Sequence, residues 1–426
     1  HQFQEGRPEP TAAIITGDGN QASFNLAQKV YIRREFMTNL KASYDVVVIG
    51  AGMGGLTCGA LLAKERLSLL VAEQHSKVGG CVQSFEGKGF TFDTGFDGTG
   101  GCEEGGVILD SIKELGLEKE IELIKLEPAM RIIGSDYDIT MTSLEAISEE
   151  LKRMFPAEST NINTFTEECK TTAGEFAGLA EAAPDLMSFG EKIGFIIKFL
   201  AKYPRVRKYG GKSAREVLSS FFKEPKLMTI YHCFLPFDPG AVATLMMMFL
   251  GSKEGHYYPK AGAQALSNLF AKGITKHGGD LALKTMVTRI LVEDGKATGV
   301  ELADGTQVRS CYVVSNSDGR LTFLKLVGEQ HLSPKFVKEL KETQLSGSNF
   351  LVSLGVDLDL RAMGFDGTTI TLNRSDDLNE LYSTDPEKCA LGIQMHSLRD
   401  PSQAPAGMST IGLRALLPYN FMDNWK

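Results

Sequence analysis

The 426-residue chain lacks several features that would assign it to common functional classes. No apolar run approaches the roughly 18 residues that a membrane-spanning helix needs, the nearest being residues 241–250, so we expect no transmembrane segment. Long runs of one charge sign are missing and the formal net charge is −8, which argues against a nucleic-acid partner. The chain also has no H-E-x-x-H, G-x-S-x-G or paired metal-ligand motif, so no metal site is expected.

The cysteines lack the spacing of a disulfide framework or a zinc site. Seven are scattered along the chain without any C-x-x-C pair. An odd, scattered set is typical of reduced thiols, which predicts a reducing compartment and hence a cytoplasmic location. They are Cys58, Cys81, Cys102, Cys169, Cys233, Cys311 and Cys389.

The composition is otherwise ordinary for a globular protein. Hydrophobic residues make up 42% of the sequence and charged residues 23%. A chain of this length exceeds one simple core, so we predict two interleaved domains. Residues 1–36 carry neither the apolar core of a signal peptide nor a clear periodicity, and we expect them to be a non-native or disordered leader.

A glycine-rich turn follows the first predicted strand. The stretch "YDVVVIG", residues 44–50, is nearly all apolar and β-branched, which is typical of a strand covered on both faces. Gly50, Gly52 and Gly55 then form a G-x-G-x-x-G pattern that opens an apolar-faced helix. The first glycine makes a tight turn, the second lets a pyrophosphate approach the backbone, and the third lets the helix pack closely. The unpaired N–H groups of the helix N-terminus attract the same anion. The pattern predicts a dinucleotide site, and a glycine-rich turn in another βα unit is the alternative.

An acidic residue at the end of the next predicted strand supports the dinucleotide. Glu73 lies 23 residues after Gly50, where a carboxylate is expected to hydrogen-bond a ribose hydroxyl and to disfavour the 2′-phosphate of NADP. For Glu73 alone, a solvated strand end is the alternative. A second glycine pair, Gly79 and Gly80, follows the acid. An extended flavin dinucleotide must run past such a loop, whereas a nicotinamide dehydrogenase has no such constraint, so FAD is the predicted cofactor.

These motifs together resemble a known family. G-x-G-x-x-G, E-x-x-x-x-x-G-G and the later "GFTFDTG" resemble the FAD-dependent oxidoreductases that include phytoene desaturases, carotenoid isomerases and retinol saturases. Residues 254–318, with "YPKAGAQAL" and "DGKATG", are similar to that family's return into its FAD domain, and "SNFLVSLGVDLDL" is similar to its substrate-domain sheet. The resemblance extends from Tyr44 to about Tyr419.

The resemblance implies an α/β fold of the amine-oxidase and phytoene-desaturase type, in which a Rossmann-type FAD-binding domain is interleaved with an α+β substrate domain. We assign residues 37–145 and 255–325 to the FAD-binding domain and residues 146–254 and 326–426 to the substrate domain. The family's last glycine-rich segment, which helps to hold the flavin ring, is expected to be missing from this chain. Many relatives also have an arginine where this chain has Cys81, which we interpret as a small residue filling a tight position.

The expected cofactor-binding residues follow from the motifs and from the resemblance. The resemblance implies that the position of Val287 presents its backbone to the adenine. Gly54 and Gly59 are more typical of close helix packing than of direct contact. The full set is Gly50, Ala51, Gly52, Met53, Gly54, Gly55, Glu73, Gln74, Gly79, Gly80, Gly95 and Val287.

The expected chemistry needs few acid–base residues. Hydride exchange between a flavin and a carbon chain leaves the protein to orient a polyene and to exclude water. His75 is interpreted as a solvated loop residue, and His232, His256 and His396 fall nearer the predicted substrate regions. The Met-rich residues 233–251 are expected either to line an apolar tunnel or to form a buried core helix. With no second G-x-G-x-x-G, electrons must pass through a bound substrate, oxygen, a quinone or a separate reductase, and the partner stays open.

A basic amphipathic segment suggests contact with a membrane. Residues 191–212 contain seven basic residues and one acid. Such a segment is typical of a helix that lies in the headgroup region, from which a hydrophobic substrate could be collected. We expect Phe195, Ile196 and Phe199 to dip toward the acyl chains and the basic side chains to meet headgroups. An ordinary surface helix whose apolar face packs inward is the alternative. The basic residues expected to meet headgroups are Lys198, Lys202, Arg205, Arg207 and Lys208.

The sequence therefore predicts an FAD-dependent oxidoreductase that saturates, desaturates or isomerises double bonds of a carotenoid-like or retinoid-like lipid. A flavin amine oxidase is one alternative. The other is a non-catalytic carrier of prenyl lipids, because GDP dissociation inhibitors have a similar fold. Glu73 and the Gly79–Gly80 pair argue against a carrier, which has no need of a pyrophosphate site.

Overall fold

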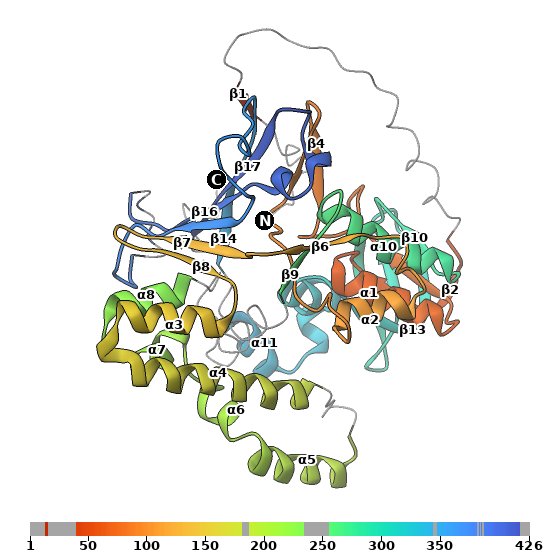
Figure 1. The fold of residues 1–426 in the computed structure, drawn as a ribbon. Coiled ribbons are helices and arrows are strands. Elements are labelled where there is room, and N and C mark those ends of the chain that lie inside the picture. The colour runs from red at the N-terminus through yellow and green to blue at the C-terminus, as the bar shows by residue number, and fades with distance from the viewer. Residues whose placement is uncertain are drawn as a thin grey trace.

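Two large sheets, two small two-stranded sheets and a group of helices make up the computed structural model (Figure 1). The described residues are 13–15, 40–180, 187–233, 255–343, 347–380, 383, 385 and 387–417. Within these ranges no helix combines the length and the hydropathy needed to cross a bilayer. The Met-rich stretch lies outside the described residues except for Cys233.

A six-stranded sheet carries the glycine-rich motif. Four of its strands are parallel and the last two are antiparallel. Their order is β10 (Asp280–Ala282), β3 (Leu69–Ala72), β2 (Ser43–Ile49), β13 (Gln307–Ser315), β12 (Lys296–Leu302) and β11 (Val287–Glu293). Strand β2 forms because its β-branched residues are buried on both faces, Val46 and Val48 toward the helices and Val47 and Ile49 toward the opposite core.

Helices cover one face of this sheet. Helix α1 (Met53–Lys64) packs against α10 (Ala263–Lys276), and α2 (Val107–Glu114) completes the same buried cluster. The π-helix η3 (Leu321–Gly328) contributes Leu326 to the core of the other face. The short η4 (Glu329–His331) and α11 (Pro334–Glu342) follow it.

A mixed seven-stranded sheet forms the second layer. Its order is β1 (Ala13–Ile15), β14 (Ser348–Val356), β17 (Ser409–Leu417), β16 (Leu391–Gln394), β15 (Thr369–Leu372), β7 (Met130–Ile133) and β8 (Asp138–Met141). Beside the sheets lie the pairs β4 (Ser84–Gly87) with β5 (Phe90–Asp93) and β6 (Leu123–Leu126) with β9 (His256–Pro259). The 3₁₀ turns η5 (His396–Leu398) and η6 (Pro401–Gln403) precede β17.

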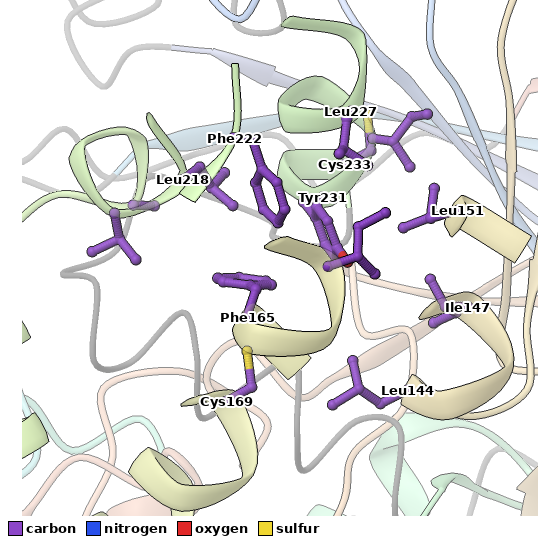
Figure 2. Close-up of a cluster of buried hydrophobic side chains, with 14 of the residues drawn as sticks. Leu144, Ile147, Leu151, Phe165, Cys169, Leu218, Phe222, Leu227, Tyr231 and Cys233 are labelled. Carbon is purple, nitrogen blue, oxygen red and sulfur yellow. The ribbon is translucent and has the colours of Figure 1, made fainter. Parts of the chain in front are cut away.

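A helical core lies below the seven-stranded sheet in Figure 1. It comprises α3 (Leu144–Met154), η1 (Pro156–Glu158), α4 (Ser159–Ala180), α6 (Pro204–Tyr209), α7 (Ala214–Phe221) and α8 (Pro225–Cys233). Helix α5 (Phe189–Lys202) precedes α6 and contributes no buried residue. Figure 2 shows how Phe165, Phe222 and Tyr231 meet at its centre, where each ring centroid lies 4.9 to 5.2 Å from the other two. Aromatic rings at these separations stabilise a core beyond the area that they bury.

Several expectations can be compared with this architecture. The predicted strands at residues 44–50 and 348–360 are present as β2 and β14, and "DGKATG" joins β11 to β12. Strands β7 and β8 belong to the seven-stranded sheet, so the chain joins that sheet near residue 130, earlier than the expected boundary at residue 145. Within the expected leader, β1 pairs with β14. All seven cysteines are free, as expected of reduced thiols.

Candidate cofactor site

The carboxyl ends of three adjacent parallel strands bring the predicted site together. Strands β3, β2 and β13 are neighbours, so the residues that follow them share one edge of the sheet. These residues are Glu73, Gly50 and Asn316. In open α/β sheets, ligands bind outside this carboxyl edge.

Bare backbone forms the turn between β2 and α1. Gly50 has φ +92°, a conformation that favours glycine. A Cβ at Gly55 would lie 2.1 Å from the Gly50 carbonyl oxygen, so only glycine lets the helix begin this close to the turn. Gly52 is the N-cap of α1 and supplies no side-chain cap, which leaves the first N–H groups of the helix for an anion.

The Glu73 carboxylate joins the turn to the following loop. Its Oε2 accepts a hydrogen bond from the Ala51 N–H at 2.7 Å, and its Oε1 accepts one from the His75 N–H at 2.8 Å. The residue is only 7% exposed. A carboxylate has about four acceptor positions, so two remain for hydroxyl donors. Its expected partner, a ribose, stays a prediction.

The second glycine pair lies directly against the first motif. The Gly79 N–H donates to the Ala51 carbonyl oxygen at 2.7 Å, and Gly52 forms an isolated β-bridge with Gly79. Gly80, at φ +61°, is so close that its Cβ would lie 3.2 Å from the Gly52 Cα. The two motifs, separate in the sequence, therefore form one glycine-lined surface at the carboxyl edge.

The remaining candidates lie around this surface. Val287 begins β11, and Thr285, two residues earlier, donates its N–H to the Glu73 carbonyl oxygen at 2.7 Å. Gly95 has φ +106° and follows Thr94, whose hydroxyl donates to the Cys81 carbonyl oxygen at 3.1 Å. A Cβ built at Gly95 would meet no atom of the structure within 4 Å.

Two of the predicted cofactor-binding residues, Gln74 and Met53, lie near the glycine-lined surface but make few contacts there. Gln74 is exposed, and its Nε2 lies 3.5 Å from the His75 ring. Met53 is half-buried, and its sulfur accepts a hydrogen bond from the Ser267 hydroxyl at 3.4 Å. Gly59 packs the helix as expected, since a Cβ there would lie 2.8 Å from a Val71 methyl. A Cβ at Gly54 would meet the Asn316 side chain instead, at 2.7 Å.

Asn316 is the residue that the sequence analysis missed. Its N–H donates to the Ile49 carbonyl oxygen at 2.9 Å, and its side-chain amide lies 2.6 Å from where a Gly52 Cβ would be. The amide therefore lies over the glycine turn. The available signal was its position immediately after "CYVVS", because residues that follow parallel strands gather at one edge.

The histidines occupy different environments. His75 is exposed in the loop after Glu73, as expected. His232 and His396 are buried and His256 is half-buried. His396 lines a cavity on the seven-stranded sheet.

The fold and its carboxyl edge define an α/β protein with a dinucleotide-type glycine turn. The model of the family described as flavin containing amine oxidoreductase matches residues 53–349, and the chain belongs to this family. The expected fold class and the expected cofactor, FAD, are thereby confirmed.

Curated relatives agree with the expected resemblance. The chain is 27% identical to an inactive all-trans-retinol 13,14-reductase of Danio rerio, over 94% of the chain and 69% of the relative. It is 29% identical to a 4,4′-diapophytoene desaturase of Methylomonas sp, over 90% and 75%. It is 28% identical to a chloroplastic prolycopene isomerase of Daucus carota, over 74% and 53%. The chain thus spans between about half and three quarters of the length of these relatives.

Solved structures share the fold. An oxidoreductase from Methanosarcina mazei is 19% identical, with a TM-score of 0.58 over 87% of this chain and 78% of that one. Wild-type putrescine oxidase bound to putrescine is 16% identical, with a TM-score of 0.56 over 88% and 76%. At these identities the comparison concerns the fold alone.

Proposed function

We propose that this protein is an FAD-dependent oxidoreductase acting on carbon–carbon double bonds of a hydrophobic polyene, as a saturase, desaturase or isomerase. The observation that carries the proposal is the single glycine-lined surface beside Glu73, in a chain whose relatives are named for retinol, diapophytoene and prolycopene. A carrier without catalysis would not need this surface.

The residues at the carboxyl edge fit the dinucleotide. The N–H groups at the start of α1 and the backbone of Gly50 and Gly52 would hold the pyrophosphate. The spare acceptor positions of Glu73 would bind ribose hydroxyls. The backbone at Val287, anchored beside Glu73 through Thr285, would meet the adenine. We retain the remaining predicted residues as candidates around these three.

The protein's part in the reaction is to bind and orient. FAD, when bound, supplies the hydride acceptor or donor. The chain's residues keep the reacting carbons near the cofactor and exclude water, which is worth several orders of magnitude in rate. Substrates of this type have few polar atoms, which is consistent with the absence of a catalytic acid–base motif from the sequence.

Anaerobic mixing tests the proposal. Protein reconstituted with FAD would be prepared with the flavin oxidised and, separately, with the flavin reduced. Each form would be mixed with all-trans-retinol, 4,4′-diapophytoene, prolycopene or putrescine. We expect at least one polyene to change the flavin spectrum or to be converted to a product resolved by chromatography. If putrescine alone reduces the flavin and no polyene changes, the protein is an amine oxidase and the proposal is wrong.

Helix α5 supports a second proposal, attachment to an anionic membrane surface. Figure 1 shows α5 extending from α6 at the lower edge of the molecule, away from both sheets. None of its residues is buried. Five large apolar residues of α5 each lie three or four residues from another member of the set, so they form one stripe along the helix. They are Phe189 (81% exposed), Ile193 (45%), Ile196 (54%), Ile197 (62%) and Leu200 (54%).

The stripe differs from the one expected from the sequence. Ile196 belongs to it, but Phe199 packs against the helical core, with its ring centroid 6.0 Å from that of Tyr203. Phe195 is also half-buried, beside Phe199. The rest of the protein covers the face of α5 that carries Phe195 and Phe199, and the face that carries the isoleucines is exposed to solvent.

The basic residues also divide into two groups. Arg205 pairs with Glu168 and Glu175 at 3.0 and 3.2 Å, and Lys208 pairs with Glu168 at 3.2 Å, so these two hold α6 to α4. Lys192, Lys198 and Lys202 on α5 are exposed, and so is Arg207. Each cationic side chain near an anionic membrane contributes about 1 kcal/mol to the binding free energy. The apolar stripe and the lysines of α5 together therefore favour binding to a membrane of anionic lipid.

Liposome flotation tests the attachment with a matched pair of variants. Ile197 and Met363 are 62% and 61% exposed, but only Ile197 lies on α5. We expect Ile197→Glu to reduce flotation with anionic vesicles severalfold and Met363→Glu to leave it unchanged. Equal flotation of both variants with the wild type would contradict the proposal, as would equal flotation with neutral vesicles.

A further inference from the structure

A polar cavity lies between strand β5 and one face of the seven-stranded sheet. Asp93 comes from β5, and Ser353, Gly412 and Gln394 come from three neighbouring strands, β14, β17 and β16. Gly412 pairs with Ser353 on one side and with Gln394 on the other, so the three form one row across the sheet. His396 also lines this cavity, which we call the polar pocket, and the other lining residues are Thr91, Phe92, Leu351, Gln403 and Thr410.

Two buried side-chain atoms of the polar pocket have no hydrogen-bond partner in the described structure. They are Nε2 of Gln394 and Nε2 of His396, in residues that are 5% and 8% exposed. Buried polar atoms of native proteins are nearly always paired with protein, with water or with a ligand. Two such atoms lining one cavity therefore point to a bound water or to a polar group of a ligand at this place.

A network around Asp93 determines what each atom can offer. The Asp93 carboxylate accepts hydrogen bonds from the Ser84 hydroxyl at 2.5 Å, the Ala263 N–H at 3.0 Å and the Tyr258 hydroxyl. Its Oδ2 also lies 3.6 Å from Nδ1 of His396, and the Tyr258 ring packs on the imidazole with centroids 4.6 Å apart.

The imidazole tautomer follows from this arrangement. A carboxylate that faces Nδ1 favours the proton on that nitrogen, which leaves Nε2 of a neutral imidazole as an acceptor. Nε2 of Gln394 is a donor. The polar pocket thus presents one acceptor and one donor, which suits a group that both donates and accepts, either a water molecule or a ligand hydroxyl that displaces it. A carbonyl oxygen would leave His396 unpaired, and a hydrocarbon end would leave both atoms unpaired.

The geometry points to the polar pocket as the site that binds the terminal hydroxyl of a polyene alcohol. The inference rests on the proposed function and narrows it from polyenes in general to hydroxyl-bearing ones. The location is consistent, because Asp93 lies two residues before Gly95 in the loop that continues toward the cofactor surface.

Gly412 provides an independent way to disturb the pocket. A Cβ there would lie 2.9 Å from Oε1 of Gln394, so Gly412→Ala would push the amide from its position without removing it. Gln394→Leu and His396→Phe remove the donor and the acceptor while keeping similar shapes. Thr369→Val is the control, since Thr369 is buried on the same sheet but does not line the pocket.

The test compares two probes that differ only in the hydroxyl. All-trans-retinol and the corresponding hydrocarbon, axerophtene, would be titrated into the FAD-loaded protein, with quenching of flavin fluorescence as the readout. We expect the wild type and Thr369→Val to bind retinol about tenfold more tightly than the hydrocarbon. Gln394→Leu and His396→Phe should lose this preference with hydrocarbon affinity unchanged, and Gly412→Ala should reduce it.

The outcomes separate this inference from the proposed function. Equal affinity of the wild type for both probes overturns the hydroxyl site and leaves a polyene enzyme. A preference that survives in both Gln394→Leu and His396→Phe overturns it as well. If the wild type binds neither probe and no polyene alters the flavin, the proposed function fails and the hydroxyl site fails with it. Because the hydrocarbon arm also reports folding, a damaged variant is recognised by loss of both probes, and the wild-type comparison then decides.

Discussion

The carboxyl edge of the six-stranded sheet and the polar pocket of the seven-stranded sheet are built in opposite ways. At the carboxyl edge, backbone groups come into contact because glycines have no side chains to keep them apart. The Gly79 N–H bonds to the Ala51 carbonyl oxygen, and Gly80 lies close to Gly52. In the polar pocket, long side chains from distant segments meet, as where Asp93 contacts Tyr258 and His396. Under the two proposals above, the first arrangement would bind the dinucleotide cofactor, and the second would distinguish a hydroxyl-bearing substrate from a hydrocarbon.

The difference also sets how each region fails when it is changed. Adding one carbon to the carboxyl edge blocks a close backbone approach that nothing nearby can relieve. Removing one partner from a buried side-chain network leaves another group unpaired, so the cost falls on the stability of the fold. The predictions below test this contrast.

The largest effect is expected at Gly55. In Gly55→Ala the new methyl would lie 2.1 Å from the Gly50 carbonyl oxygen, so the turn or the helix must move. We expect FAD affinity to fall at least about 100-fold, or about 2.7 kcal/mol, measured by flavin fluorescence titration. Gly174→Ala is the control, because a Cβ there meets nothing within 4 Å. Retention of FAD by Gly55→Ala would show that the turn is not rigid.

The next effect is expected at Asp93, in the side-chain network. Asp93→Asn weakens the hydrogen bonds from Ser84, Tyr258 and the Ala263 N–H, which join the β4–β5 hairpin to β9 and to the start of α10. We expect the free energy of unfolding to fall by about 2–3 kcal/mol in urea denaturation. The exposed Asp110→Asn on α2 should change it by less than about 0.5 kcal/mol. An equally small change at Asp93 would mean that the network is not stabilising.

A pH-dependent effect is expected at Glu168, which links α4 to α6. Burial alone would raise the pKa of this carboxyl, but hydrogen bonds from Tyr209, Arg205 and Lys208 outweigh it and hold the pKa below its usual range. A lowered pKa in the folded state stabilises the protein above the unfolded pKa, and this contribution is lost as pH falls through the folded pKa.

The corresponding measurement is urea unfolding of Glu168→Gln against pH. At pH 7 we expect a loss of about 1–2 kcal/mol, and the gap to the wild type should narrow below about pH 4. The neighbouring Glu167→Gln, whose side chain is 71% exposed, should differ from the wild type by less than about 0.5 kcal/mol. A gap for Glu168→Gln that does not change with pH would contradict the ionised interaction.

The smallest effect concerns thiol labelling around the carboxyl edge. Burial raises the pKa of Cys102 to about 12, so it should stay protonated and resist iodoacetamide at pH 8, whereas the exposed Cys81 and Cys311 should react. Peptide mass spectrometry would follow each site. Added FAD should slow labelling at Cys81, next to Gly80, by a fewfold and leave Cys311 unchanged. Equal protection of both would contradict the placement of the cofactor.

The sequence predicts the carboxyl edge far better than the polar pocket, for a physical reason. A buried parallel strand, a glycine turn and an acid after the next strand are local patterns, so β2, Gly50 and Glu73 could all be found. Asn316 could not, because it reaches the turn only when β13 pairs with β2. His396 was placed near the substrate region, but no local pattern indicates that it meets Asp93.

Helix α5 also shows what a local sequence pattern cannot predict. The amphipathic periodicity predicts a helix whose apolar face either meets a membrane or packs inward, and the helix is present. Periodicity does not say which of two apolar faces the protein covers. The structure covers Phe199 and exposes Ile193 and Ile197, because Tyr203 and the helical core lie on the phenylalanine side.

The pairing of β2 with β13 also has a consequence for synthesis on the ribosome. Ser43 pairs with Arg309, and Ile49 with Ser315, so the centre of the six-stranded sheet is filled by a strand that emerges long after its neighbour. Until then the nascent chain exposes one unsatisfied edge of β2 and, on one face, Val47 and Ile49, whose core is completed by residues of β11, β12, β13 and η3. Such non-local pairing folds slowly and leaves aggregation-prone surface uncovered until β13 has been made.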